Sequence, residues 1–159
     1  MPKIVDHDAY REELVAQAVK YFSDHGYAGA SMRKIADHLG VSKSAIYHYF
    51  PSKADLFLAC TKHMMSFVDQ EFTKPKGSQK ERVQQMIDTL RADFRSEMAI
   101  SVEYSRGKTK EDIANDEAMQ FMLEGYKRNV ASIVPPNKVD ETLALIWGTL
   151  LIEYFSGEL

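Results

Sequence analysis

Apolar side chains recur every three or four positions along most of the chain, which is the periodicity of amphipathic α-helices. The first such stripe runs through residues 10–22 and predicts a helix from about Asp8 to His25. Gly26 follows at the position where a left-handed helix cap is easiest for the backbone. Strand signals are scarce and no internal repeat is present, so the pattern predicts an all-α fold.

Two short helices are predicted next, because each has a capping serine in front of it and a helix-stopping residue behind it. Ser31 precedes the first helix, which Gly40 closes. Ser42 precedes the second helix, and Pro51 ends it by pushing the preceding residue out of the helical region.

The rest of the chain carries longer amphipathic patterns, most of them preceded by a capping residue. The predicted helices are 52–72, 78–94, 98–106, 110–134 and 138–156, with N-caps at Ser52, Ser78, Thr109 and Asn137. The clearest break falls at residues 73–77. This organisation predicts an N-terminal three-helix domain at residues 1–51 and a second helical domain at residues 52–159.

The composition is typical of a soluble globular protein, since the chain has 159 residues, 45% of them hydrophobic and 27% charged. No apolar run approaches the ~20 residues that span a bilayer. Residues 1–8 also lack the apolar core of a signal peptide. Cys60, the single cysteine, excludes an internal disulfide and fits a reducing compartment. A cytoplasmic location is therefore expected.

The net charge of −3 does not by itself indicate a nucleic-acid binder. Residues 1–62 hold eight lysines and arginines against seven aspartates and glutamates, a balance of +1. The remainder holds twelve against sixteen, a balance of −4. Any DNA-binding surface must therefore gather its positive charge through folding rather than through composition.

Residues 31–50 have the layout of a helix-turn-helix, whose second helix enters the major groove of DNA. Gly40 permits the sharp turn, and Ile46 and Phe50 lie four residues apart, so both can face the domain core. The residues left facing outward are Lys43, Ser44, Ala45, Tyr47 and His48, none of which is acidic. Lys53 follows at the start of the next helix, where backbone N–H groups favour a phosphate.

The longer stretch to which these residues belong comprises Phe22, Gly26, Ser31-Met32-Arg33-Lys34-Ile35-Ala36 and Gly40-Val41-Ser42-Lys43-Ser44-Ala45-Ile46-Tyr47-His48-Tyr49-Phe50-Pro51-Ser52-Lys53-Ala54-Asp55-Leu56. It resembles the DNA-binding domain of the TetR family of repressors over about residues 10–56. Leu39 departs from the family pattern, which often has a small residue before the turn glycine. The remaining two-thirds of the chain resembles the family only in being helical.

The resemblance implies DNA contacts for specific residues. Ser31 and Arg33 would touch phosphates from the first helix of the motif, and Lys53 would clamp another phosphate. In the second helix, the first residues would face base edges and the later ones the DNA backbone. The implied DNA-binding residues are Ser31, Arg33, Ser42, Lys43, Ser44, Ala45, Tyr47, His48 and Lys53.

The resemblance also implies a homodimer, in which helices at about residues 110–134 and 138–156 of each subunit form a four-helix interface. The last helix is apolar on more than one side, which independently favours a partner surface, although a central core helix would show the same pattern. The expected interface residues are Leu145, Gly148, Ile152 and Phe155.

Methionine and aromatic residues are abundant in the C-terminal part of the chain, and methionine suits irregular, adaptable cavities. Each of these residues could equally be an ordinary core residue. The candidates for lining a hydrophobic effector pocket are Met64, Phe67, Met86, Phe94, Met98, Tyr104, Phe121, Met122, Tyr126 and Trp147.

Together these features predict a transcriptional repressor that binds palindromic operator DNA and is released by a small, largely hydrophobic effector. The alternative is a DNA-binding regulator that has no small-molecule effector and is controlled by a protein partner. No catalytic set converges in the sequence, so an enzyme is not expected. No pair of histidines has the i, i+4 spacing of metal ligands on one helix face, and neither a metal nor another cofactor is expected.

Overall fold

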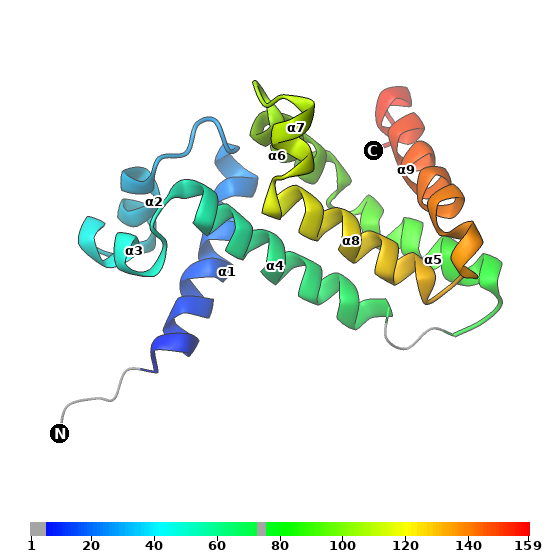
Figure 1. Cartoon of the computed structure of the whole chain (residues 1–159), viewed down its shortest axis with the longest axis horizontal. Coiled ribbons are helices and arrows are strands. Elements are labelled where there is room, and N and C mark those ends of the chain that lie inside the picture. The colour runs from blue at the N-terminus through cyan, green and yellow to red at the C-terminus, as the bar shows by residue number, and fades with distance from the viewer. Residues whose placement is uncertain (1–5, 73–75) are drawn as a thin grey trace.

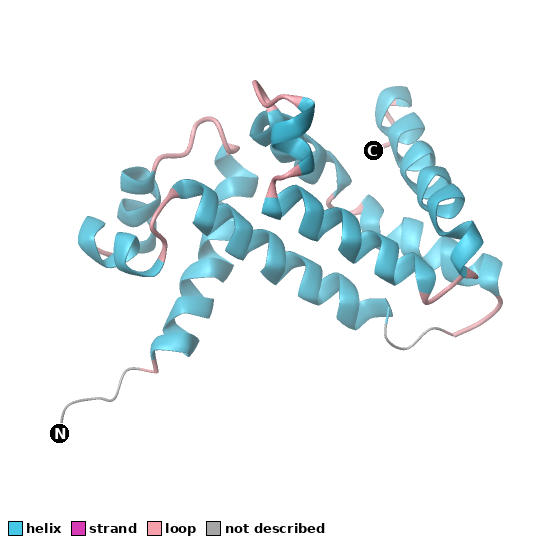
Figure 2. Cartoon of the chain, viewed as in Figure 1, coloured by secondary structure: helices cyan, strands magenta, loops and turns pink. Residues whose placement is uncertain are grey.

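The computed structural model describes residues 6–72 and 76–159, and every regular element in these residues is a helix (Figure 2). The helices are α1 (His7–His25), α2 (Met32–Leu39), α3 (Lys43–Tyr49), α4 (Lys53–Phe72), α5 (Gln79–Arg91), α6 (Phe94–Ser105), α7 (Lys110–Ala114), α8 (Glu117–Ala131), the short 3-10 helix η1 (Pro136–Lys138) and α9 (Val139–Ser156). The prediction of an all-α fold is confirmed. Residues 1–5 and most of the predicted break, residues 73–75, lie outside the described residues.

Helix α4 connects the two ends of the molecule (Figure 1). α1, α2 and α3 gather around its N-terminal end, whereas α5, α8 and α9 lie toward its C-terminal end. α4 packs along both α1 and α8. Among the helices of residues 6–72 and 76–159, none combines the length and the apolar character that crossing a membrane requires.

Buried apolar side chains form two clusters, and α4 contributes to both. The N-terminal cluster joins α1, α2, α3 and α4 as far as Cys60, and it also takes in Tyr104 of α6 and Ala118 of α8. The C-terminal cluster begins at Met65 of α4 and joins α5, α8, α9 and the first residue of α6. The packing therefore changes partner along α4, between Cys60 and Met65. The predicted domain boundary after residue 51 stays a prediction.

Serine caps begin four of the helices at the predicted residues, which are Ser31, Ser42, Ser52 and Ser78. Ser31 and Ser42 each accept a hydrogen bond from the backbone N–H group three residues further on, at 3.3 and 3.1 Å. Ser78 and Glu81 make both hydrogen bonds of a capping box. Each cap is satisfied within the first turn of its own helix, so the local sequence is enough to place these starts.

The predicted helix at residues 78–94 is too long. α5 ends at Arg91, and Phe94 begins the next helix. The Phe94 side chain is 2% exposed, and its ring lies 5.6 Å from that of Trp147 in α9. The apolar stripe continues through the break because Phe94 still faces the core. The helix that Phe94 begins packs on α1, whereas α5 packs on α9.

The predicted helix at residues 110–134 is two helices. Thr109 caps only the short α7, and the side chain of Asp116 then accepts a hydrogen bond from the Met119 N–H group at 3.0 Å to begin α8. A second capping carboxylate inside an apolar pattern offers the backbone an alternative to a continuous helix. The predicted cap at Asn137 is also wrong, because this residue lies in η1 and α9 begins without a side-chain cap.

Candidate nucleic-acid interface and ligand pocket

The helix-turn-helix is built by α2, α3 and a tight turn between them. Gly40 has a φ of 68°, in the left-handed region that favours glycine, and this turn redirects the chain from α2 into α3. The Val41 N–H group donates to the Ala36 carbonyl at 3.0 Å and closes the turn. Ile46 and Phe50 are 0% and 1% exposed, so α3 is held to the core by one face only.

The opposite face of α3 is turned to solvent. Lys43, Ser44, Tyr47 and His48 are exposed, and Ala45 is half-buried. The Lys43 ammonium lies 5.9 Å from the centre of the Tyr47 ring, a cation–π arrangement. Since α3 contains no acidic residue, this face presents cationic, hydroxyl and ring groups to an approaching phosphate without repelling it.

The predicted phosphate contacts of α2 are its N-cap, Ser31, and Arg33 in its first turn. Ser31 and Arg33 are both exposed. The Ser31 hydroxyl oxygen already accepts the capping hydrogen bond of α2, so its remaining O–H is the group free to donate to a phosphate.

Lys53 has a role that the sequence pattern did not indicate. Its ammonium donates to the carbonyl oxygens of Tyr27 and Ala30, each at 3.0 Å, and lies 4.0 Å from the centre of the Tyr27 ring. Burial lowers the pKa of the Lys53 ammonium. Lys53 thus ties the start of α4 to the loop between α1 and α2. Its predicted phosphate contact stays a prediction. In this structure the Lys53 ammonium donates its hydrogen bonds to the loop.

Contacts also run from this loop into the second half of the molecule. The Tyr27 ring packs edge-on against Tyr104 of α6, with 4.8 Å between ring centroids, and the Tyr104 hydroxyl donates to Asp116 at 2.8 Å. Lys108 forms a salt bridge with the same carboxylate. Burial tends to raise the pKa of Asp116, but the hydrogen bonds from Lys108, the Met119 N–H group and Tyr104 lower it below its usual value. Tyr104, a candidate for the effector pocket, instead joins the two halves.

A cavity of about 480 Å³ lies where α1, α4, α5, α6 and α8 meet, and most of its lining surface is apolar. Four of the candidate pocket residues line it, namely Met64, Phe67, Met122 and Tyr126. The other candidates do not line it, and apart from Tyr104 they belong to the C-terminal cluster or pack against it; they are Met86, Phe94, Met98, Phe121 and Trp147. Helical periodicity identifies buried faces, but it does not separate a cavity wall from a filled core.

The cavity also has lining residues that the sequence pattern missed. Cys60 lies in its wall, and burial raises the pKa of this thiol to about 12, so the thiol is not a reactive thiolate near neutral pH. Glu97 of α6 and His63 of α4 add ionisable groups to the lining. Polar residues inside apolar stripes were the signal that could have identified them.

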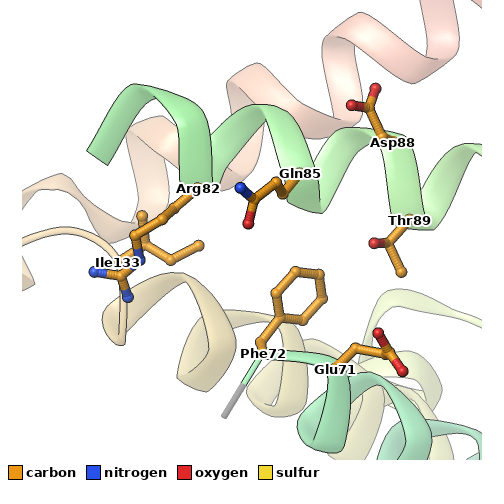
Figure 3. A pocket seen from close by; sticks show the side chains of 7 residues that line it. All are labelled: Glu71, Phe72, Arg82, Gln85, Asp88, Thr89 and Ile133. Carbon is orange, nitrogen blue, oxygen red and sulfur yellow. The ribbon is translucent and has the colours of Figure 1, made fainter. Parts of the chain in front are cut away.

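A smaller cavity of about 330 Å³ lies between the C-terminal end of α4 and α5. Figure 3 shows its lining residues, which are Glu71, Phe72, Arg82, Gln85, Asp88, Thr89 and Ile133. Arg82 also donates a hydrogen bond to the Ser132 carbonyl oxygen. Positive and negative side chains both line this cavity, so it has no clear preference for a charged ligand.

α9 has an apolar stripe that its own subunit does not cover. Leu145, Ile152 and Phe155 are 60%, 70% and 81% exposed. Their spacing of seven and three residues places them on one side of the helix together with Gly148. A Cβ atom built on Gly148 would meet nothing within 4 Å, so the surface beside this glycine is open.

The arrangement of α1, α2 and α3 defines a class of protein, the helix-turn-helix DNA-binding proteins. Residues 14–60 match the family described as bacterial regulatory proteins, tetR family. Over 49 residues the chain is 43% identical to the HTH-type transcriptional repressor AcnR of Corynebacterium diphtheriae; the match covers 31% of this chain and 26% of that protein. The match thus spans about a quarter of the relative's length. Residues 14–60 are therefore similar to the DNA-binding region of TetR-family regulators.

Two solved structures extend the likeness in fold to most of the chain. FadR from Bacillus subtilis, in complex with stearoyl-CoA, has a TM-score of 0.66 at 21% identity and covers 87% of this chain and 82% of its own. AibR, in complex with isovaleryl coenzyme A and operator DNA, has a TM-score of 0.60 at 16% identity and covers 91% of this chain and 85% of its own. Both likenesses concern the fold alone.

Proposed function

We propose that this protein is a transcriptional repressor that binds palindromic operator DNA as a homodimer and is released by a small, largely hydrophobic effector. The observation that carries the proposal is the two-sided character of α3. One side is anchored by Ile46 and Phe50, and the other is exposed and free of acidic residues. A recognition helix needs both properties, because it must be rigid toward the protein and open toward the groove.

The exposed stripe of α9 supports the dimer. Leu145, Ile152 and Phe155 leave more apolar surface on one helix than a stable monomer usually exposes. A two-fold partner would bring the same stripe against itself, since such an interface is self-complementary. The resulting dimer would present two α3 helices to neighbouring half-sites, about 34–36 Å apart along the DNA.

The position of the larger cavity supports control by an effector. Its wall includes Val19 and Phe22 of α1 and several residues of α4, the helix that also carries Lys53 at its other end. A ligand that binds one arrangement of these helices more tightly would shift the population of dimers able to bind DNA. A volume of about 480 Å³ is in the range of small-molecule sites, which favours an effector over control by a protein partner alone.

The proposed DNA contacts are tested with operator DNA selected from a random duplex library. Lys43→Ala is expected to weaken binding by about 1–3 kcal/mol and to relax the preference for particular bases. Lys53→Ala is expected to weaken binding to all sequences alike and to reduce the slope of log affinity against log salt by about 1. Affinities are measured by fluorescence anisotropy at several salt concentrations.

Lys138→Ala is the matched control, because it removes an equal charge from an exposed residue just before α9. This variant is expected to bind like the wild type. If Lys43→Ala and Lys53→Ala both match Lys138→Ala in affinity and salt dependence, α3 and the start of α4 are not the DNA-binding surface.

A further inference from the structure

The ionisable residues that line the larger cavity are unbalanced in charge. Three of the lining residues are acidic: Glu71, Asp93 and Glu97. Among the described residues that line it, none is a lysine or an arginine, and His63 is the one residue able to carry a positive charge. A ligand in this cavity therefore contacts mostly apolar side chains and, in addition, carboxylate groups.

Glu97 is the acidic residue whose position matters most. It comes from α6, and its carboxylate accepts a hydrogen bond from the hydroxyl of Tyr126 in α8 at 3.2 Å. Both side chains line the cavity. Burial raises the pKa of Glu97, the hydrogen bond from Tyr126 lowers it, and the nearby charge of Asp93 raises it again, with a net upward shift. The ionised form is thus desolvated, and none of the described residues pairs with it as a cation, so an incoming positive charge would stabilise it.

Aromatic side chains also line the larger cavity. Phe22 of α1, Phe57 and Phe67 of α4 and Tyr126 of α8 all contribute to the lining. Phe67 is 55% exposed, which is unusual for a phenylalanine and leaves its ring accessible to a ligand. Aromatic faces attract cations and also bind apolar groups, so they suit a ligand that has both.

We propose that the effector is a lipophilic organic cation, whose apolar groups fill the cavity and whose positive charge pairs with Glu97. This inference rests on the proposed function, since it names the ligand of the proposed effector site. Charge complementarity between the ligand and Glu71, Asp93 and Glu97 sets the preference. Stearoyl-CoA and isovaleryl coenzyme A, the molecules bound to the two structural neighbours, carry phosphates that such a lining would repel.

The test compares two probes of nearly equal size and shape and opposite charge, tetraphenylphosphonium and tetraphenylborate. Binding of each to the full chain is measured by isothermal titration calorimetry. Tetraphenylphosphonium is expected to bind saturably with one site per chain, and tetraphenylborate is expected not to bind. Because this comparison needs no variant, it does not depend on whether a mutant folds. Equal binding of both probes, or binding of the borate alone, overturns the inference.

Two variants locate the charge pair. Glu97→Gln keeps the shape of the side chain and is expected to weaken tetraphenylphosphonium binding roughly tenfold or more, the usual scale for a charge-assisted contact. Glu111→Gln is the matched control, because this exposed residue of α7 does not line the cavity, and it is expected to bind like the wild type. Full affinity in Glu97→Gln overturns the assigned role of Glu97.

A DNA-binding measurement separates failure of this inference from failure of the proposed function. Tetraphenylphosphonium is expected to weaken the binding of wild-type protein to its selected operator. If the protein binds the operator but not the cation, or if stearoyl-CoA binds the cavity instead, the ligand class is wrong and the repressor function stands. If the protein binds the cation but no DNA sequence, the repressor function is wrong and the cation site stands.

Discussion

The two hydrophobic clusters of this protein differ in how completely they close. The N-terminal cluster buries the apolar faces of α2 and α3 together with that of α1 and leaves little apolar surface exposed. Among the described residues, the exposed large apolar side chains lie beyond Cys60, with Tyr47 of α3 as the one exception. The C-terminal cluster leaves the stripe of α9 uncovered. The larger cavity lies between the two clusters, since Phe22 and Cys60 of the N-terminal cluster and Met65 and Leu90 of the C-terminal cluster all line it.

This difference suits the two regions to different functions. The N-terminal region is complete in one chain and presents polar groups outward, as suits a rigid module that reads DNA. The C-terminal region leaves an external face uncovered and shares the larger cavity with the N-terminal cluster, which is where the proposed second subunit and effector would bind. Substitutions in each region test this difference.

The largest expected effect concerns the closed cluster. Phe50 is 1% exposed and belongs to the N-terminal cluster, so Phe50→Ala leaves a cavity and is expected to cost about 3–5 kcal/mol of unfolding free energy. Phe67→Ala is the matched control in the open region, where a 55% exposed ring has less burial to lose. Urea unfolding monitored by circular dichroism measures both. Equal losses for the two variants would contradict the contrast between the regions.

The next effect concerns the uncovered stripe of α9. Ile152→Asp places a charge in the proposed subunit interface and is expected to halve the mass in solution, because an unpaired buried charge costs several kcal/mol. The helix content should not change, since Ile152 is 70% exposed within one subunit. Light scattering coupled to size exclusion gives the mass. Tyr47→Asp, on the exposed face of α3, serves as the control and should keep the dimer intact. A dimeric Ile152→Asp would exclude this face as the interface.

A smaller effect is expected where the two regions touch. Gly26 has φ 71° and ψ 170°, a backbone conformation that is essentially restricted to glycine. A Cβ atom at this position would lie 2.5 Å from Glu103 Oε2, the oxygen that also accepts the Ala28 N–H hydrogen bond. Gly26→Ala is therefore expected to cost roughly 1–3 kcal/mol.

The control for Gly26→Ala is Gly40→Ala. Gly40 also has a positive φ, but a Cβ atom there would meet nothing within 4 Å. The control thus carries backbone strain without the clash and should be the milder of the two in thermal unfolding. If Gly40→Ala is as destabilising as Gly26→Ala, the contact between Glu103 and the end of α1 adds nothing.

Much of the N-terminal region could be predicted because its signals are local. Ser31, Gly40 and Ser42 fix helix ends through contacts within a few residues, and Ile46 and Phe50 mark the buried face by their spacing. The exception is Lys53, whose partners are backbone carbonyls more than twenty residues away in the chain. Nothing in the local pattern distinguishes these oxygens from those of a phosphate.

The C-terminal region was less predictable because its structure depends on partners distant in the chain. The helices that the apolar pattern joins are interrupted just before Phe94 and at Asp116, and both side chains contact other elements, Trp147 and Tyr104. The cavity depends on which buried faces meet and how well they fill the space. Methionine and aromatic content alone placed Met122 and Met86 in one group, although only Met122 lines the cavity.

The central claim, that two exposed α3 helices in a dimer read DNA, is tested most directly by selecting duplexes from a random library and sequencing those that bind. A dimer of this kind is expected to enrich a two-fold symmetric sequence whose half-sites are centred about one helical turn, 34–36 Å, apart. Lys43→Ala is expected to relax base preference at equivalent positions of both half-sites. A library that shows no enrichment, or that enriches one asymmetric sequence unaffected by Lys43→Ala, would contradict the central claim.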